Sequence, residues 1–194
     1  MDLITLDFET YYDKDYSLKK LTTEEYVRDP RFEVIGIGVK VNNEETEWAS
    51  GSHDQIKEYL QTFKWGDAMV LAHNTMFDGA ILSWVFDIHP KVYADTLCMS
   101  RAFHGVETSG SLDALATRYN IGVKGAEVVN TLGKKRGEFS KDDLARFGDY
   151  CINDVDLTYK LFTIIGNRPY LTHVFRACLR FRLNAIRATF YRNT

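Results

Sequence analysis

Two acidic side chains stand one residue apart at the end of an apolar N-terminal segment. The segment runs from Ile4 to Thr10, and its acids are Asp7 and Glu9. If it forms a β-strand, both carboxylates point to the same face, because successive side chains of a strand alternate between faces. Neighbouring carboxylates repel each other, and a divalent cation with oxygen ligands would offset that repulsion. The alternative is that the two acids only end the strand and begin a turn.

A further acid, Asp78, lies in the first turn of a helix expected over residues 76–86. The wholly apolar run at 68–72 precedes it and favours a strand that is buried on both faces. Ligand sites of open α/β sheets gather beyond the carboxyl ends of strands, so Asn74 and Asp78 are expected beside the first pair of acids. Asp78 could equally serve only to complement the helix dipole.

A long helix, expected from about residue 140 to 165, supplies the third group. Tyr150 and Asp154 are four residues apart, and residues at this spacing share a helix face with about 5–6 Å between their Cβ atoms. A phenol and a carboxylate could therefore reach the same rim of the sheet. The alternative makes Asp154 one of several exposed acids and Tyr150 a core residue.

In chain order these stretches are D-x-E, N-x-x-x-D and Y-x-x-x-D. The pattern resembles the DEDD superfamily of 3′–5′ exonucleases, in its tyrosine-bearing branch. The histidine-bearing branch would have a histidine five residues before the last aspartate, where this sequence has Asp149. Residues 95–119 resemble the linking region of the superfamily, and the match extends from residue 1 to about 165. The run Arg-Phe-Glu-Val at 31–34 is most similar to proofreading exonuclease domains of bacteriophage-type family A DNA polymerases.

The resemblance implies an RNase H-like fold and hydrolysis of phosphodiesters with two divalent metal ions, Mg²⁺ or in its place Mn²⁺. By resemblance, Asp7 would bridge both ions. Glu9 and Asp154 would complete the site of the ion that activates water. Asp78 would hold the second ion through water.

The resemblance also assigns residues to the substrate. Tyr150 would orient the attacking water, since a phenol with a pKa of about 10 is a poor base at neutral pH. Thr10 and Asn74 resemble positions that contact the terminal nucleotide. Aromatic side chains that could stack on unpaired bases, or equally belong to the core, are Phe8, Tyr11, Tyr12 and Phe77.

The elements that must position these residues follow from the hydrophobic periodicity. Strands are expected at residues 2–9, 33–41, 46–49, 68–72 and 91–94, and helices at about 22–29, 53–63, 76–86, 96–103, 111–119 and 140–165. This order predicts an α/β fold with a mixed, mostly five-stranded sheet and helices on both faces. Residues 120–139 contain several glycines and are expected to form a mobile loop.

The length of 194 residues suits one domain. We expect the exonuclease domain at residues 1–167 and a basic helical extension at 168–194. The extension has six arginines and no acid, which leaves residues 1–167 with a net charge of −9. An acidic body binds nucleic acid poorly, so bound metal would have to offset its charge. The extension could hold nucleic acid or a partner, or only present solvated arginines above an apolar stripe.

The three cysteines form no C-x-x-C pair, which favours a reducing compartment such as the cytoplasm of a bacterium. No apolar run approaches the ~20 residues of a membrane span, and no basic-then-apolar leader opens the sequence. We therefore expect a cytoplasmic protein of phage or bacterial type that does not act at a membrane.

The leading hypothesis is a metal-dependent 3′–5′ exonuclease of proofreading type that acts on single-stranded DNA ends. It would work alone or beside a polymerase module. The first alternative is a 3′–5′ exoribonuclease similar to ribonuclease D, because discrimination depends on contacts near the 2′-hydroxyl group. The second is a non-catalytic module that binds nucleic acid or a partner, against which the complete set of acids argues.

Overall fold

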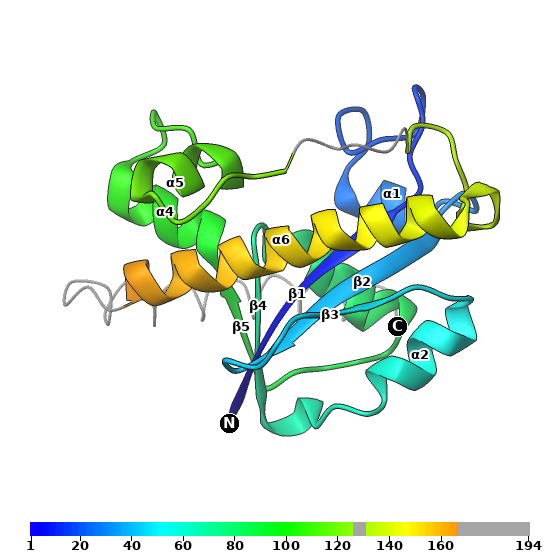
Figure 1. Cartoon of the computed structure of the whole chain (residues 1–194), viewed down its shortest axis with the longest axis horizontal. Helices are drawn as coiled ribbons and strands as arrows, with labels where there is room; N and C mark the ends of the chain where they lie inside the picture. Colours follow the sequence, from blue (N-terminus) through cyan, green and yellow to red (C-terminus); the bar gives the residue numbers. More distant parts are fainter. Residues whose placement is uncertain (126–130, 167–194) are drawn as a thin grey trace.

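The computed structural model describes residues 1–125 and 131–166, which form a five-stranded sheet with helices on both faces (Figure 1). The strand order is β3-β2-β1-β4-β5. The strands are β1 (Asp2–Thr10), β2 (Val34–Val41), β3 (Glu47–Ala49), β4 (Ala68–Ala72) and β5 (Val92–Asp95). Because β1 pairs antiparallel with β2 and parallel with β4, the sheet is mixed. The predicted α/β class and mixed five-stranded sheet are confirmed.

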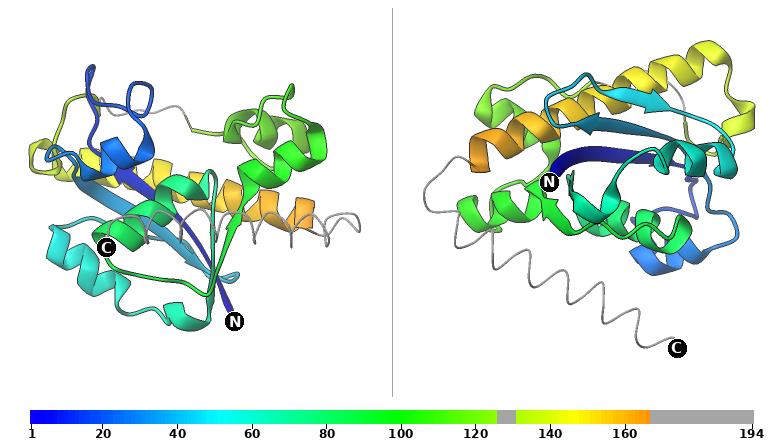
Figure 2. Two further views of the ribbon diagram at one scale, coloured as in Figure 1. Left: turned by 180° about the vertical axis from the view of Figure 1, so that it is seen from behind. Right: turned by 90° about the horizontal axis from the view of Figure 1, so that it is seen from below.

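The helices are α1 (Thr23–Arg28), α2 (His53–Leu60), α3 (Thr75–Ala80), α4 (Thr96–His104), α5 (Leu112–Tyr119) and α6 (Lys141–Gly166). Helix α6 crosses one face of the sheet and α3 packs on the opposite face (Figure 2). Helices α4 and α5 also contact α6. The helix predicted over residues 76–86 is present, but it changes from α to π geometry at Ile81–Val85.

Side-chain caps explain where several helices begin. Thr22 and Ser52 each form a capping box, in which the hydroxyl group accepts a hydrogen bond from the backbone three residues later. Ser140 accepts one from the backbone N–H of Asp143 at 3.1 Å, directly before α6. The cap at Ser140 fixes the start of α6, which lies close to the start expected at about residue 140.

A close approach between α6 and β2 places the middle of α6 above the end of β1. A Cβ atom on Gly38 of β2 would lie 2.9 Å from Cys151 Sγ and 3.0 Å from Val155 Cγ2, both on α6. Glycine at this position therefore allows the helix to pack directly against the sheet. The residues beside Cys151 on α6 are brought to the carboxyl end of β1 as a result.

The side chains of β1 alternate between two environments. Leu6 and Phe8 are 1% and 4% exposed and belong to the core on the α3 side of the sheet. The ring of Phe8 stacks on Phe86 with 5.9 Å between ring centroids. Asp7 and Glu9 therefore face α6, as the predicted alternation requires.

The predicted mobile loop at 120–139 is partly described, and residues 131–139 are tied to the segment after β1. The backbone N–H of Gly133 donates to the carbonyl of Tyr12 at 2.8 Å, and the hydroxyl groups of Tyr12 and Thr131 lie 2.9 Å apart. The prediction of mobility did not anticipate these contacts. Residues 126–130 and the predicted basic extension at 168–194 lie outside the described residues. Within the described ranges, no helix is both long enough and apolar enough to span a membrane.

Candidate active site

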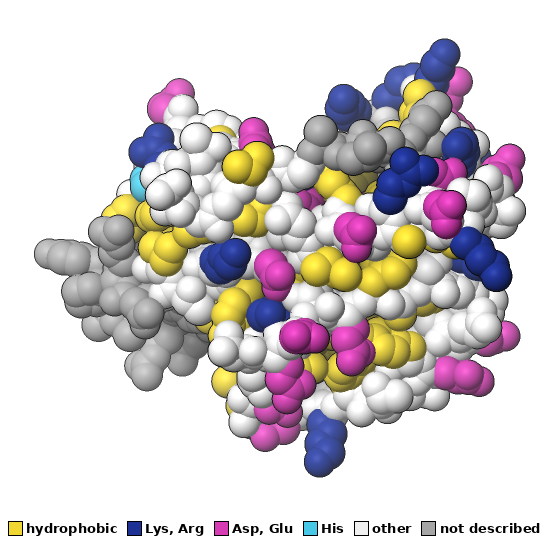
Figure 3. Space-filling view, in the orientation of Figure 1, with side chains coloured by type: hydrophobic (Ala, Val, Ile, Leu, Met, Phe, Trp, Pro, Cys, Tyr) yellow, Lys and Arg dark blue, Asp and Glu magenta, His cyan; other side chains and the backbone are white. Residues whose placement is uncertain are grey.

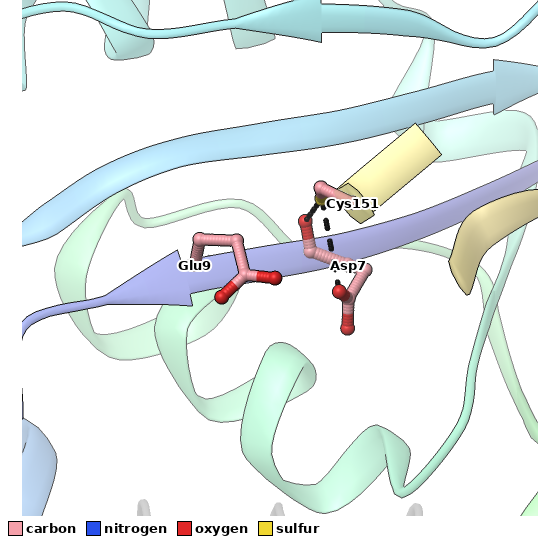
Figure 4. A group of neighbouring side chains, drawn as sticks. All are labelled: Asp7, Glu9 and Cys151. Atoms are coloured by element: carbon pink, nitrogen blue, oxygen red, sulfur yellow. Dashed lines mark hydrogen bonds between the residues drawn. The ribbon is translucent and has the colours of Figure 1, made fainter. Parts of the chain in front are cut away.

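The first two acids lie side by side on β1. Figure 4 shows Asp7 and Glu9 on one side of the strand, with Cys151 reaching them from α6. One ligand atom from each of these residues lies within 4.8 Å of the other two. The Cys151 thiol donates a hydrogen bond to the main-chain oxygen of Asp7 at 3.4 Å and lies 3.7 Å from Asp7 Oδ2. Cys151 was not among the residues predicted for the site.

Asp78 joins the same site from α3. Its side chain is 2% exposed, and its Oδ1 accepts a hydrogen bond from the backbone N–H of Phe8 at 3.0 Å. Burial and the charge of Asp7 raise the pKa of Asp78 well above its ordinary value. The turn into α3 requires a left-handed residue, and Asn74 adopts it with a φ of 76°.

Helix α6 contributes Asp154 and Tyr150. Asp154 is 6% exposed, and its Oδ2 pairs with the Nζ of Lys124 at 2.7 Å. Its Oδ1 is buried and has no hydrogen-bond partner among the described residues. Burial and the charge of Asp154 raise the pKa of Tyr150 to about 12, so the phenol stays protonated and can donate a hydrogen bond at neutral pH.

The electrostatics of the acids favour an added cation. Burial and then the charge of Asp154 raise the pKa of Asp7 to about 7, although Lys124 and the Cys151 thiol act in the opposite direction. Burial also raises the pKa of Asp154, against the effect of its pair with Lys124. For Lys124 itself, burial opposes the charge, but the bond to Asp154 prevails and raises the pKa. One lysine therefore leaves the acids with uncompensated negative charge.

All four acids and Tyr150 line one hollow of about 300 Å³. Its lining residues are Asp7, Phe8, Glu9, Tyr12, His73, Asn74, Phe77, Asp78, Lys124, Tyr150 and Asp154. A second hollow of about 390 Å³ extends towards α4 and α5, and it shares Asp7, His73, Lys124 and Asp154 with the first. Figure 3 shows the surface hollowed above α6, between the α4–α5 pair and the region of α1.

Only some of the residues predicted to bind substrate line the first hollow and remain accessible there. Asn74 and Phe77 line the first hollow. Phe8 also contributes to the lining, but its ring is buried in the core. Thr10 is not among the lining residues, and its hydroxyl lies 2.9 Å from that of Tyr26. Tyr12 lines the hollow, whereas the neighbouring tyrosine at position 11 does not.

Two lining residues were not singled out by the sequence analysis. Lys124 comes from the glycine-containing segment at 120–139, where a single lysine carries no distinguishing pattern. His73 was not predicted as a site residue, and its ring nitrogens bond to Thr96 Oγ1 at 2.8 Å and to the carbonyl of Gly110 at 2.9 Å. This ring ties the end of β4 to α4 and to the segment before α5. Its position directly before Asn74, at the end of a buried strand, was the available signal.

The donor set fits hard divalent cations. Carboxylate oxygens are the ligands that Mg²⁺ prefers, and it binds through a few carboxylates while keeping water or phosphate ligands. Asp154 Oδ1, buried without a described partner, is an acceptor that such an ion would satisfy. The raised pKa values of Asp7, Asp78 and Asp154 have the same origin, since buried acids without sufficient positive charge retain their protons.

Comparison with known proteins shows the family to which the chain belongs. The model of a 3′–5′ exonuclease family matches residues 12–168. The chain belongs to this family. The match includes Asp78, Tyr150 and Asp154 and begins after the D-x-E pair on β1. No curated protein matches the exonuclease.

Solved structures agree on the fold. Brucella melitensis NrnC is 16% identical with a TM-score of 0.67, over 96% of the exonuclease and 86% of NrnC. Escherichia coli RNase D is 15% identical with a TM-score of 0.58, over 95% and 44% of the two chains. The family B DNA polymerase of Pyrobaculum calidifontis is 14% identical with a TM-score of 0.61, over 85% and 24%. The predicted RNase H-like fold and membership of the DEDD exonuclease superfamily are thus confirmed.

Proposed function

We propose that the exonuclease removes nucleotides from the 3′ ends of single-stranded DNA with two divalent metal ions, Mg²⁺ or Mn²⁺. One observation carries the proposal: four carboxylates from β1, α3 and α6 line a single hollow together with Tyr150. The solved structure of NrnC with bound Mg²⁺ supports the choice of metal. The bound ions would supply an activated water and stabilise the leaving 3′ oxygen.

The four acids take different parts in this proposal. Asp7 lines the hollow together with Glu9 of its own strand and Asp154 of α6, and it would contact both ions. Glu9 and Asp154 would complete the site beside the attacking water. Asp78 already accepts a hydrogen bond from a backbone N–H through Oδ1, so it would hold the second ion through water.

Tyr150 would hold the attacking water by a hydrogen bond. With a pKa of about 12 it is a donor and not a base at neutral pH. Its position four residues before Asp154 is the reason for proposing the tyrosine-bearing branch of the superfamily. A tyrosine in this role positions water, and the proton of the water leaves to solvent or to an acid nearby.

For the terminal nucleotide, Asn74 and Phe77 are the better-supported contacts, because both line the hollow. Phe77 is half-buried, which leaves part of its ring available for stacking. The proposed contacts of Thr10 and Phe8 rest on the family resemblance, since a hydroxyl bonded to Tyr26 and a core ring offer little surface to a nucleotide.

A second candidate function, hydrolysis of RNA from the 3′ end, has comparable support. RNase D is an exoribonuclease involved in structured RNA processing, and NrnC has been solved bound to pGG. The likeness to a family B DNA polymerase and the similarity of residues 31–34 to bacteriophage proofreading domains favour DNA. We propose a domain at residues 1–167, cytoplasmic in location, that acts alone or beside a polymerase module. The basic segment 168–194 would be an added extension.

The test compares single-stranded DNA and RNA of one sequence, each labelled at the 5′ end, with Mg²⁺, Mn²⁺ or EDTA. The proposal expects stepwise 3′ shortening of DNA that EDTA and Asp154→Ala abolish. The matched control is Asp142→Ala, which removes an exposed acid from the first turn of the same helix and should leave activity unchanged. Shortening of RNA alone would establish the second candidate, and metal-independent cleavage would contradict both.

A further inference from the structure

Lys124 pairs with Asp154, a carboxylate that the proposed function assigns to a metal ion. Its Nζ lies 2.7 Å from Asp154 Oδ2, and the side chains of the pair are 30% and 8% exposed. The same Nζ lies 5.3 Å from the ring centroid of Tyr150. Lys124 thus touches two of the residues to which the proposed function gives roles, although it was not among the residues predicted from the sequence.

The position of Lys124 relative to the hollows indicates a second role. It lines both hollows, together with His73, Asp7 and Asp154. These four residues form a wall shared by the two hollows. If the last nucleotide of a strand filled the first hollow and the preceding nucleotide filled the second, the phosphodiester bond between them would lie at this shared wall. The residues that line only the second hollow include Arg101 and Ser111, which are polar groups suited to a nucleotide.

A divalent ion bound to the Asp154 carboxylate, through either oxygen, would stand within a few ångströms of the Lys124 ammonium group, and the two positive charges repel each other. Asp154 Oδ2 is taken by Lys124, and the proposed metal site needs that carboxylate. Lysine has a flexible stem and a compact charge, so its ammonium group can move from one anion to another within reach. At the shared wall, that second anion is the phosphate of the bond to be cleaved.

We propose that Lys124 gives up its ion pair with Asp154 when this carboxylate binds a divalent ion, and then contacts a non-bridging oxygen of the phosphate being cleaved. The proposal rests on the proposed function, because it needs both the metal and the phosphodiester. Lys124 would act in two stages. It compensates the acids before metal binds, and it stabilises the charge that develops on the phosphate during hydrolysis.

The chain contains a matched control, a second lysine that pairs with an aspartate of α6. Lys40 Nζ pairs with Asp156 at 3.2 Å and lies 5.4 Å from the ring centroid of Tyr159. Lys40 therefore repeats the contacts of Lys124 with one aspartate and one tyrosine of α6, but it lines neither hollow. Lys40→Gln removes an equivalent ion pair without touching the site.

The experiment has two measurements on the full chain. The first is a titration with Mn²⁺ in the absence of nucleic acid, in which calorimetry measures the binding affinity. Removing the competing ammonium group should make Lys124→Gln bind Mn²⁺ at least threefold more tightly than wild type, while Lys40→Gln stays within twofold. An unchanged or weaker affinity in Lys124→Gln would overturn the exchange of cations, and a weaker one would mean that Lys124 only holds Asp154 in place.

The second measurement is kcat with saturating Mg²⁺, on the labelled strand and on the p-nitrophenyl ester of thymidine 5′-monophosphate. Because that ester has only the phosphate being cleaved, Lys124→Gln should lower kcat at least tenfold on both substrates, and Lys124→Arg should restore part of the loss. A kcat within twofold of Lys40→Gln would overturn the phosphate contact. If wild type cleaved neither substrate, the proposed function and the phosphate contact would both fail, whereas the Mn²⁺ titration would still decide the exchange.

Discussion

Replacing Asp7 with asparagine should stabilise the metal-free protein at pH 8 while it abolishes hydrolysis. Burial and the charge of Asp154 raise the pKa of Asp7 from 3.8 to about 7. A carboxyl group with a raised pKa binds its proton more tightly in the folded state, so its ionisation destabilises the fold as the pH rises from the unfolded to the folded pKa. Asparagine has nearly the same shape and carries no charge.

The size of the effect follows from the shift. A shift of one pKa unit corresponds to about 1.36 kcal/mol. The part of the shift between pH 5 and pH 7 therefore changes the free energy of unfolding by about 3 kcal/mol, which is an upper bound because neighbouring acids titrate together. The advantage of Asp7→Asn over wild type should therefore grow by up to that amount between pH 5 and pH 8. At about 2–4 °C per kcal/mol for a chain of this size, the difference in Tm would grow by as much as roughly 6–12 °C.

The assay is thermal unfolding followed by circular dichroism, in EDTA, at steps from pH 5 to pH 8. Asp67→Asn is the control, because Asp67 is exposed and its hydrogen bond to Lys91 lowers its pKa. That carboxyl group is ionised in both states throughout this range, so its variant should differ from wild type by a constant amount. A difference between Asp7→Asn and wild type that stays constant or shrinks as the pH rises would refute the reasoning. Saturating Mn²⁺ should raise the Tm of wild type but not of Asp7→Asn.

Three further results are expected. Tyr150→Phe should lower kcat at least tenfold and leave Mn²⁺ affinity unchanged in calorimetry, because the phenol is proposed to hold water and not metal. Gly38→Ala should lower the free energy of unfolding in urea by about 1–3 kcal/mol, since its Cβ would lie 2.9 Å from Cys151 Sγ, whereas Gly66→Ala, with no atom within 4 Å, should not. Arg101→Gln should raise KM for a strand but not for the p-nitrophenyl ester, because Arg101 lines only the second hollow; equal effects on both substrates would contradict this placement.

Local sequence patterns determined the elements of this protein. The apolar run at 68–72 became β4 with the predicted bounds, and α1 and α6 begin within one residue of their predicted starts, where Thr22 and Ser140 cap them. These features depend on neighbours within a few residues, so alternation, helical periodicity and capping reveal them. The order and spacing of the acidic motifs also carried the resemblance to 3′–5′ exonucleases, and the family match bears out that class.

Only the tertiary structure decided which side chains meet in the hollow. Lys124 pairs with Asp154 across 30 residues of chain, and Cys151 meets Asp7 across 144. No local pattern encodes such contacts, because they depend on how closely α6 packs on the sheet at Gly38. On the opposite face of β1, the ring of Phe8 packs in the core against Phe86, although it stands between the two acids in the sequence. The sequence thus determined the acids and their faces, and the packing of α6 determined the cation and the thiol that lie against them.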